Sequence, residues 1–343
     1  MKRLLVFRFS AMGDVAMTVP VLHSLLEEYP ELHITIVSRA AFQPFFEKLS
    51  PNLSFYVADL NGKHKGIKGL FRLYKELRQM KFDAVADLHH VLRTNFLCFC
   101  FKLSGIPVQQ LDKGRKAKKA LIRQKNKVRQ YLPTSFERYT KVFYQLGFKF
   151  KPTFTSIFKP SSPDIEKIYQ HTGEKGNNRW IGIAPFAKHT GKMYPLERME
   201  QVIKHLSQQT NYQIFLFGGG KQEIETLTHW SQKYPNTHIL SNQLKLRGEL
   251  ALISQLDVMI SMDSSNMHMA SLTHTPVISI WGATHPWCGF MGWNQSIDNA
   301  IQIDLPCRPC SIFGNKPCLR NDYACMQQIH PETIIKQIKK VLH

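Results

Sequence analysis

Residues 258–286, VMISMDSSNMHMASLTHTPVISIWGATHP, indicate the fold class of this chain. The apolar run 258–261 has the composition of a strand buried in a parallel sheet. Polar residues of the kind that cap helices follow at 263–266, a short helix is expected at 267–272 and a second strand at 277–281. Such a turn presents free N–H groups at the positive end of a helix dipole, so we expect an anion site, most often for phosphate. An ordinary capped helix is the alternative.

The rest of the chain shows the same alternation of strands and helices. Strands are expected at 3–9, 32–37, 55–58, 82–86, 180–184 and 212–217, and helices at 15–29, 42–49, 66–80, 196–207, 221–230 and from about 331 to the end. This order predicts an α/β fold with parallel sheets covered on both faces, and ligands at the carboxyl ends of the strands. The proline-containing stretch 149–175 is the expected connection, which divides the chain into domains 1–160 and 161–343.

The charge of the chain is unusual for a globular protein of 343 residues. Its formal net charge is +20, of which residues 1–160 contribute +17 and residues 161–343 contribute +3. A basic first domain is expected to face an anionic partner, and nucleic acid, an acidic membrane surface and a phosphorylated glycolipid all fit. No signal peptide or membrane-spanning run is evident, and seven cysteines in a chain of this size fit a reducing cytosol. We therefore expect a cytoplasmic protein, peripheral to a membrane.

The run DSSNMHMASL…PVISIWGAT.P at 263–286 resembles the signature of glycosyltransferase family 9, the heptosyltransferases of lipopolysaccharide core assembly. The resemblance implies the GT-B architecture, in which two Rossmann-like parallel-sheet domains face each other across a cleft. It also implies that this segment binds an activated donor. The expected ligands are Asp263 and His268 for the donor sugar, and Ser264, Ser265 and Asn266 for the diphosphate. Ser265 stands where the family has glycine.

A second match lies at the start of the chain, where the expected strand runs into SAMGD, residues 10–14. The family opens with a similar strand–turn–helix pattern, whose aspartate acts as general base. The resemblance therefore implies that Asp14 takes the proton of the attacking hydroxyl, a step for which a carboxylate is suited. Ser10 and Gly13 are then expected near the acceptor. The simpler interpretation of Asp14 is a helix N-cap.

The nucleotide side of the donor site is expected from two further loops. Lys192, in the sequence KMYP, matches a family lysine that binds the donor phosphates, where an ammonium would stabilise the departing diphosphate. The glycine loop of Gly218, Gly219 and Gly220 resembles the family loop whose acid reaches the ribose, with Glu223 as the nearest match and Glu225 as the second. Without the other motifs, each loop is weak evidence for a site.

The acceptor side is less well specified by the sequence. His89 and His90 follow an expected strand, and the stretch 113–129 contains nine Lys or Arg and no acid. Those of its cations expected to meet the acceptor are Lys113, Arg115, Lys116, Lys118 and Lys119. The stretch is expected to be an electrostatic platform for glycolipid phosphates or anionic headgroups, with a solvated mobile loop as the alternative.

Four cysteines near the end of the chain, Cys307, Cys310, Cys318 and Cys325, have a spacing compatible with a structural zinc site. Reduced cysteines that only pack against their neighbours are the preferred interpretation, since zinc is not part of the mechanism that the resemblance implies.

The resemblance implies an inverting, metal-independent transfer of heptose from ADP-heptose to an inner-core glycolipid, with no cofactor beyond the nucleotide sugar. The last helix is expected to cross back to the first domain. Two alternatives remain open. Ser265 favours a family member that uses another nucleotide sugar, a hexose or N-acetylhexosamine, for a capsule or lipid-linked glycan. The basic first half would suit a nucleic-acid-binding protein, but the usual motifs are missing and the phosphate-site motifs would be unexplained.

Overall fold

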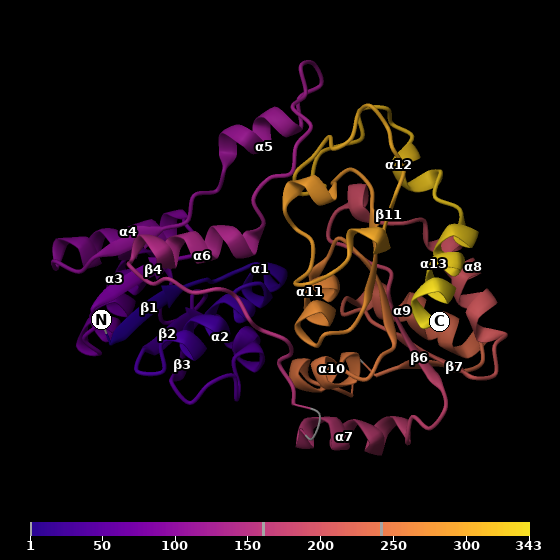
Figure 1. Ribbon diagram of the computed structural model, residues 1–343, viewed down its shortest axis with the longest axis horizontal. Helices are drawn as coiled ribbons and strands as arrows, with labels where there is room; N and C mark the ends of the chain where they lie inside the picture. The colour runs from indigo at the N-terminus through magenta and orange to yellow at the C-terminus, as the bar shows by residue number, and fades with distance from the viewer. Residues whose placement is uncertain (1, 160–161, 241–242) are drawn as a thin grey trace. The chain divides into compact units, whose positions relative to one another are not determined.

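The computed structural model describes residues 2–159, 162–240 and 243–343 and divides into two compact units. The first consists of Met1–Gly114 and Pro133–Thr155, and the second of Arg115–Leu132 and Ser156–His343. The chain leaves the first unit after Thr155, inside the proline-containing connection, whereas the expected boundary at 160/161 lies outside the described residues. Each unit contains one parallel sheet with helices on both faces (Figure 1).

The first unit has the sheet order β3-β2-β1-β4-β5, with all strands parallel. Its elements are β1 (Arg3–Phe7), α1 (Met12–Ala16), α2 (Val19–Glu28), β2 (His33–Ser38), the 3-10 turn η1 (Ala40–Phe45), β3 (Leu53–Val57), α3 (Gly66–Gln79), β4 (Ala84–Asp87), α4 (Leu92–Leu103), β5 (Val108–Gln110) and α6 (Ser135–Gln145). Because side chains alternate along a strand, Leu5 and Phe7 pack under α3 and α4 while Leu4 and Val6 are buried on the opposite face.

The second unit has the order β11-β10-β9-β6-β7-β8, again all parallel. Its elements are α5 (Arg115–Leu121), α7 (Pro163–Thr172), β6 (Arg179–Ala184), η2 (Thr190–Lys192), α8 (Leu196–Ser207), β7 (Tyr212–Leu216), α9 (Lys221–Lys233), β8 (Thr237–Ile239), α10 (Leu246–Ile253), β9 (Val258–Met262), α11 (Ser265–Leu272), β10 (Val277–Trp281), η3 (Pro286–Cys288), η4 (Ile297–Asn299), β11 (Ala300–Gln302), α12 (Ala324–Gln327) and α13 (Pro331–Leu342).

The expected helix at 15–29 is two helices, α1 and α2. Pro20, in the first turn of α2, has no N–H to donate to a carbonyl one turn earlier, so a continuous helix would lose a hydrogen bond there. The hydroxyl of Thr18 donates to the Val15 carbonyl at the junction. Helix α7, which begins inside the connection, was not expected from the sequence. It packs against α10, and Asp164 forms an ion pair with Arg247.

The basic segment Arg115–Leu132 belongs to the second unit and not to the first. The ammonium of Lys127 donates to the carbonyls of Cys307 and Pro309, both at 2.8 Å, and the Leu132 amide donates to the Trp287 carbonyl. With this segment counted where it packs, the first unit has 19 Lys and Arg against 11 Asp and Glu, and the second has 26 against 14. The net charges are thus +8 and +12, so the basic excess is not a property of the first unit alone.

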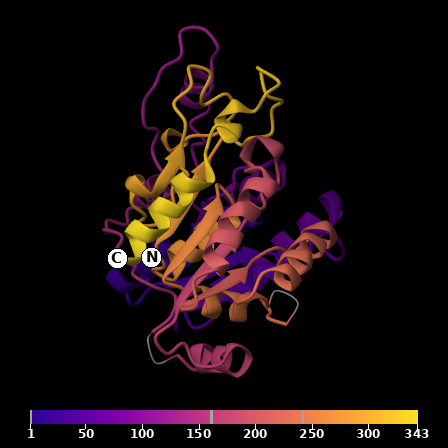
Figure 2. The ribbon, with the colours of Figure 1, turned by 90° about the vertical axis from the view of Figure 1, so that its right-hand side faces the viewer.

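The last helix, α13, packs on the second unit's own sheet. The expectation that it crosses back to the first domain stays a prediction. Its apolar side chains Ile334, Ile335, Ile338 and Leu342 are part of the second unit's core, and it lies alongside α8 (Figure 2). Their i, i+4 and i+8 spacing places them on one face of the helix, and that face is already covered. In the described part of the chain, no helix is long and apolar enough to span a bilayer.

Candidate active site

In each sheet the strand order reverses at the first strand of the unit, so that later strands lie on both sides of it. Polar side chains lie close to this point in both units. In the first unit β1 lies between β2 and β4, and in the second β6 lies between β7 and β9. Ligands of open parallel sheets bind outside the carboxyl ends of the strands at such a switch point, because the following loops diverge to opposite faces. Asp14 follows β1 and His89 follows β4, whereas Lys192 follows β6 and Asp263 follows β9.

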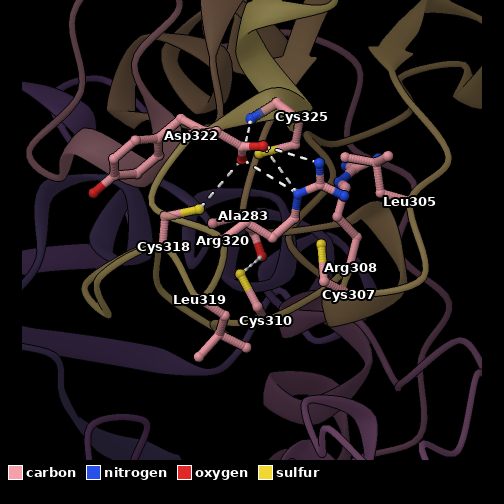
Figure 3. Close-up of a pocket in the computed structure, with 12 residues that line it drawn as sticks. Ala283, Leu305, Cys307, Arg308, Cys310, Cys318, Leu319, Arg320, Asp322 and Cys325 are labelled. Carbon is pink, nitrogen blue, oxygen red and sulfur yellow. Dashed lines mark hydrogen bonds and ion pairs between the residues drawn. The ribbon is translucent and has the colours of Figure 1, made fainter.

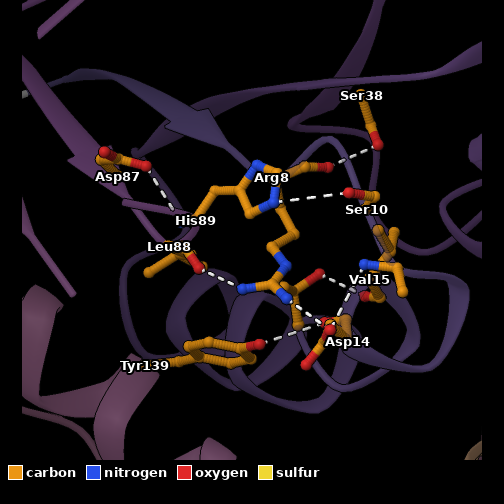
Figure 4. Close-up of polar contacts among 11 residues, drawn as sticks. Arg8, Ser10, Asp14, Val15, Ser38, Asp87, Leu88, His89 and Tyr139 are labelled. Carbon is orange, nitrogen blue, oxygen red and sulfur yellow. Dashed lines mark hydrogen bonds and ion pairs between the residues drawn. The ribbon is translucent and has the colours of Figure 1, made fainter. Parts of the chain in front are cut away.

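In the first unit, the Asp14 carboxylate is paired with a buried arginine. The Arg8 guanidinium lies 2.6 Å from Asp14 Oδ2 and donates to the Leu88 carbonyl, also at 2.6 Å (Figure 4). The Tyr139 hydroxyl donates to the backbone carbonyl of Asp14. The Asp14 side chain is 34% exposed, whereas that of Arg8 is 7% exposed, so the carboxylate is fixed from the protein side and still reaches solvent.

His89 lies beside this pair and is held in its neutral form. Its Nε2 is 3.4 Å from Ser10 Oγ, and its backbone N–H donates to Asp87 Oδ1 (Figure 4). Burial, together with the positive charge of Arg8, lowers the pKa of His89 to about 4. The structure therefore brings Ser10, Asp14 and His89 together around one point, with Gly13 in α1 beside them.

The other residues expected at the acceptor are less closely grouped. The His90 ring hydrogen-bonds the Leu111 carbonyl at 2.6 Å, which occupies its Nδ1 in a structural contact. Arg115, Lys116, Lys118 and Lys119 are on α5 of the second unit, while Lys113 is in the first, so these five cations do not form one cluster within a unit. The Lys118 ammonium lies over the rings of Phe290 and Phe313.

In the second unit, Lys192 and Asp263 form a buried ion pair. The Lys192 ammonium is 2.8 Å from Asp263 Oδ2 and donates to the Asp263 carbonyl at 3.1 Å. The two side chains are 14% and 3% exposed. Because β6 and β9 are paired neighbours, the two loops that carry these residues leave the sheet side by side. The pairing of β6 with β9 thus brings Lys192 close to Asp263, although the two residues are 71 positions apart in the sequence.

Helix α11 begins beside this pair without a side-chain cap. Its N-cap residue is Ser264, whose hydroxyl lies 3.2 Å from that of Ser261 and makes no capping bond to the helix. Ser265 and Asn266 are half-buried in the first turn, and His268 is buried in the second. The expectation that these polar residues cap the helix is therefore not met by Ser264. The backbone N–H groups of a first turn without a side-chain cap can donate hydrogen bonds to an anion.

The glycine loop after β7 is on the other side of β6, but its amides are already occupied. Glu223 Oε2 accepts hydrogen bonds from the Gly219 amide at 2.9 Å and the Gly220 amide at 3.3 Å. The carboxylate therefore caps α9, and a bound nucleotide would have to share or displace it. A Cβ at Gly218 would approach Leu227 and Phe186 within 3.2 Å, so this glycine serves packing. Glu225 is exposed.

Comparison with known proteins identifies the family of this chain. The family model described as glycosyltransferase family 9 (heptosyltransferase) matches residues 70–317, more than half of the chain. The chain belongs to glycosyltransferase family 9.

Relatives of this family 9 glycosyltransferase extend over its whole length. The lipooligosaccharide heptosyltransferase 2 of Campylobacter jejuni is 24% identical over 339 residues, which are 96% of each chain. A family 9 glycosyl transferase from Veillonella parvula has a TM-score of 0.75 at 21% identity and covers 99% of this chain and 97% of its own. The E. coli ADP-heptose lipopolysaccharide heptosyltransferase II has a TM-score of 0.72 at 17% identity, with 100% and 98% covered. The expected GT-B architecture of two Rossmann-like domains is thereby confirmed.

Two buried arginines of this family 9 enzyme were not singled out from the sequence. Arg8 interrupts an apolar strand run, and a cation in such a run signals a buried partner. Arg308 is 3% exposed and donates to the carbonyls of Gly282, Trp281 and Thr284, which fixes the loop after β10. Nothing in the local pattern around Arg308 distinguishes it from a surface arginine.

The four C-terminal cysteines line one pocket, together with Arg308 and Asp322 (Figure 3). Burial raises the pKa of Cys325 to about 11 and that of Cys310 above its usual value, so these sulfurs are thiols at neutral pH. Among the residues with described positions, no three His, Cys, Asp or Glu side chains are placed to bind a metal ion. The geometry therefore does not support the zinc hypothesis. All seven cysteines are free.

We expect the stability of the enzyme to fall on acidification from pH 6.5 to 4. Burial lowers the pKa values of His89 and His285 to about 4, and Nδ1 of His285 accepts the Trp287 amide, a bond that protonation of this nitrogen would break. Between these pH values the two histidines bind more protons in the unfolded chain than in the folded one, so their contribution to stability rises with pH up to about 6.5. Burial raises the pKa of Glu249 to about 7, which opposes this slope at one site. Urea unfolding at several pH values measures this slope. His89→Gln should flatten it, and an unchanged slope in that variant would contradict the assignment.

Proposed function

We propose that this family 9 enzyme transfers heptose from ADP-heptose to a phosphorylated inner-core glycolipid, with inversion and without a catalytic metal. The observation that carries the proposal is the Lys192–Asp263 pair at the switch point of the second sheet. It supplies one positive group for a diphosphate and one carboxylate for sugar hydroxyls. The uncapped first turn of α11, with Ser264, Ser265 and Asn266, lies next to it in the chain.

In the proposed reaction Asp14 is the general base. The acceptor hydroxyl gives its proton to the carboxylate as its oxygen attacks the anomeric carbon, and the bond from that carbon to the diphosphate oxygen breaks. Positive charge near the leaving diphosphate lowers the barrier most, since negative charge accumulates there. Lys192 has this role, and Asp263 exchanges its contact with the ammonium for hydrogen bonds from the sugar. Neutral His89 and Ser10 position the acceptor hydroxyl.

The relatives' names support the choice of substrates. The E. coli structural relative is described as an ADP-heptose enzyme, and the Campylobacter jejuni relative as a lipooligosaccharide heptosyltransferase. Membership of the family also accounts for the phosphate-site motifs that the nucleic-acid alternative leaves unexplained. An acceptor anchored in the inner membrane would place the enzyme in the cytoplasm, peripheral to that membrane.

The proposal is tested by product analysis. The purified enzyme is incubated with ADP-heptose and, in parallel, with UDP- and GDP-hexoses, and with a deacylated core glycolipid as acceptor. Mass spectrometry should detect one added heptose only with the ADP donor, and the new linkage should have the opposite anomeric configuration to the donor. Transfer of a hexose, or retention of configuration, would refute it.

Another nucleotide sugar remains the second candidate because Ser265 replaces the family's glycine. Ser265 is the first residue of α11 and has an ordinary helical backbone, so the position does not require glycine's φ; only the closeness of a phosphate is affected. Melting temperatures with ADP, UDP and GDP separate the two candidates. A nucleotide at 100 times its Kd adds about 2.7 kcal/mol to the free energy of unfolding, and a larger shift with UDP or GDP than with ADP would favour the second.

A further inference from the structure

Helix α4 of the first unit is apolar on two faces, and only one of them is covered. Leu97 and Phe101 are buried against the sheet. On the outer face Leu92, Phe99 and Leu103 are 87%, 59% and 74% exposed. Their spacing puts them, with half-buried Phe96, along one stripe of the helix. This second apolar stripe does not face the core, so it is a candidate interaction surface.

The neighbouring helix extends this apolar stripe. Helix α3 packs against α4 (Figure 1). The Tyr74 ring contacts that of Phe101 between them. On its outer side Ile67 and Phe71, one turn apart, are 72% and 43% exposed. We call Ile67, Phe71, Leu92, Phe99 and Leu103 the α3–α4 surface. These are five of the twelve large apolar side chains that are exposed among the described residues, and such concentration marks an interaction site.

The charges on the two helices are almost all positive. They are Lys68, Arg72, Lys75, Arg78, Arg93 and Lys102. The one carboxylate on α3 or α4 is Glu76, which accepts a hydrogen bond from Tyr56 and pairs with Lys63 at 2.7 Å, so its charge is already compensated. The Lys75 ammonium lies 4.9 Å from the centre of the Phe71 ring, so at this point a cation lies directly beside an exposed apolar side chain.

We propose that the α3–α4 surface binds the surface of an anionic phospholipid bilayer. The apolar side chains enter the boundary between headgroups and acyl chains, and the surrounding cations meet the lipid phosphates. Apolar residues flanked by Lys and Arg on a helix are the chemistry of interfacial binding. At 12 residues α4 is too short to span the bilayer, so it lies in the interface. A protein partner would not require six cations and one compensated acid.

The position of the α3–α4 surface suggests how the enzyme reaches its acceptor, and this part of the inference rests on the proposed function. Helix α4 begins at Leu92, directly after the His89–His90 loop at the carboxyl end of β4. A unit bound to the membrane through α4 therefore presents the Asp14–His89 group close to the lipid surface. A glycolipid anchored in the same bilayer could then offer its sugar hydroxyl without leaving the membrane.

The test measures the full chain's binding to vesicles by flotation. Vesicles containing phosphatidylglycerol are compared with vesicles of phosphatidylcholine alone, for the parent and for Phe99→Ser/Leu103→Ser. The matched control is Ile297→Ser/Leu319→Ser, which removes two exposed apolar side chains of the second unit. We expect the partition coefficient of the α4 variant to fall at least about tenfold while the control binds like the parent. Arg72→Gln/Lys102→Gln should reduce binding to phosphatidylglycerol vesicles selectively, and more at low salt.

Three outcomes would overturn the inference. The parent does not bind phosphatidylglycerol vesicles, the α4 variant binds as well as the parent, or sedimentation shows a parent dimer that the α4 variant dissociates, in which case a second copy covers the surface. Transfer to the deacylated, soluble acceptor is measured in parallel and should be unchanged in all three double variants. A parent protein that transfers heptose but does not bind vesicles would contradict this inference alone. A parent that binds vesicles but transfers no heptose would contradict the proposed function alone.

Discussion

Replacing Asp14 with asparagine is expected to lower kcat by about 10²- to 10⁴-fold, the usual contribution of a general base, and to leave the Kd for ADP unchanged. The amide keeps the size of the side chain but cannot take the proton of the attacking hydroxyl. Nucleotide affinity should be unaffected because the residues expected to bind the donor are in the other unit. Arg8 would lose its ionic partner but keep its bond to the Leu88 carbonyl, so a modest fall in melting temperature should accompany the loss of turnover.

Single-turnover kinetics with saturating donor, together with calorimetric titration of ADP, measure both quantities. Glu31→Gln is the control, since it removes an exposed carboxylate from the same unit. Retention of full turnover by Asp14→Asn would exclude Asp14 as the base. A fall in kcat with an equal loss of ADP affinity would point to a disturbed fold and not to lost proton transfer.

Replacing Lys192 with methionine should be the most destabilising of the substitutions considered, as well as preventing transfer. It leaves the Asp263 carboxylate buried without a counter-charge, and breaking a buried pair from one side costs roughly 3–5 kcal/mol. Asp263→Asn should lower the free energy of unfolding by a comparable amount, because it leaves the Lys192 ammonium buried without a counter-charge. This expectation differs from that for a capping aspartate, whose replacement by asparagine would barely change stability. The double variant should cost less than the two single costs added together, since both remove the same interaction.

The matched control is Lys233→Met. Lys233 pairs with Glu200 at 2.7 Å, but its side chain is 51% exposed, and such surface pairs contribute about 0–1 kcal/mol. Urea unfolding of the four variants and the parent gives the comparison, and calorimetry with ADP gives the donor affinity. If Lys192→Met unfolds like the parent, the ion pair does not form in solution. If it also turns over normally, the donor site must be sought elsewhere.

The sequence by itself determined the fold class and the location of the candidate site along the chain. Alternating apolar runs and helical spacings predicted parallel sheets, and α8 (Leu196–Ser207) and β10 (Val277–Trp281) have the predicted ends. Asp14 and Asp263 were singled out because the strand–turn–helix segments that carry them resemble family motifs. The structure places Asp263 directly after β9 and Asp14 in α1, beyond the turn that follows β1. These features are local: periodicity and turn chemistry depend on residues only a few positions apart.

Only the tertiary structure decided which side chains meet. The pairing of Lys192 with Asp263 depends on β6 and β9 being neighbours, and that of Arg8 with Asp14 depends on a tight turn after β1. The sequence put residues 115–132 with the first half, yet Lys127 fixes them to the loop around Cys307. It also left the outer face of α4 unnoticed, because exposure is not a property of one segment. Long-range contacts follow from strand order and packing, and neither is encoded in a local pattern.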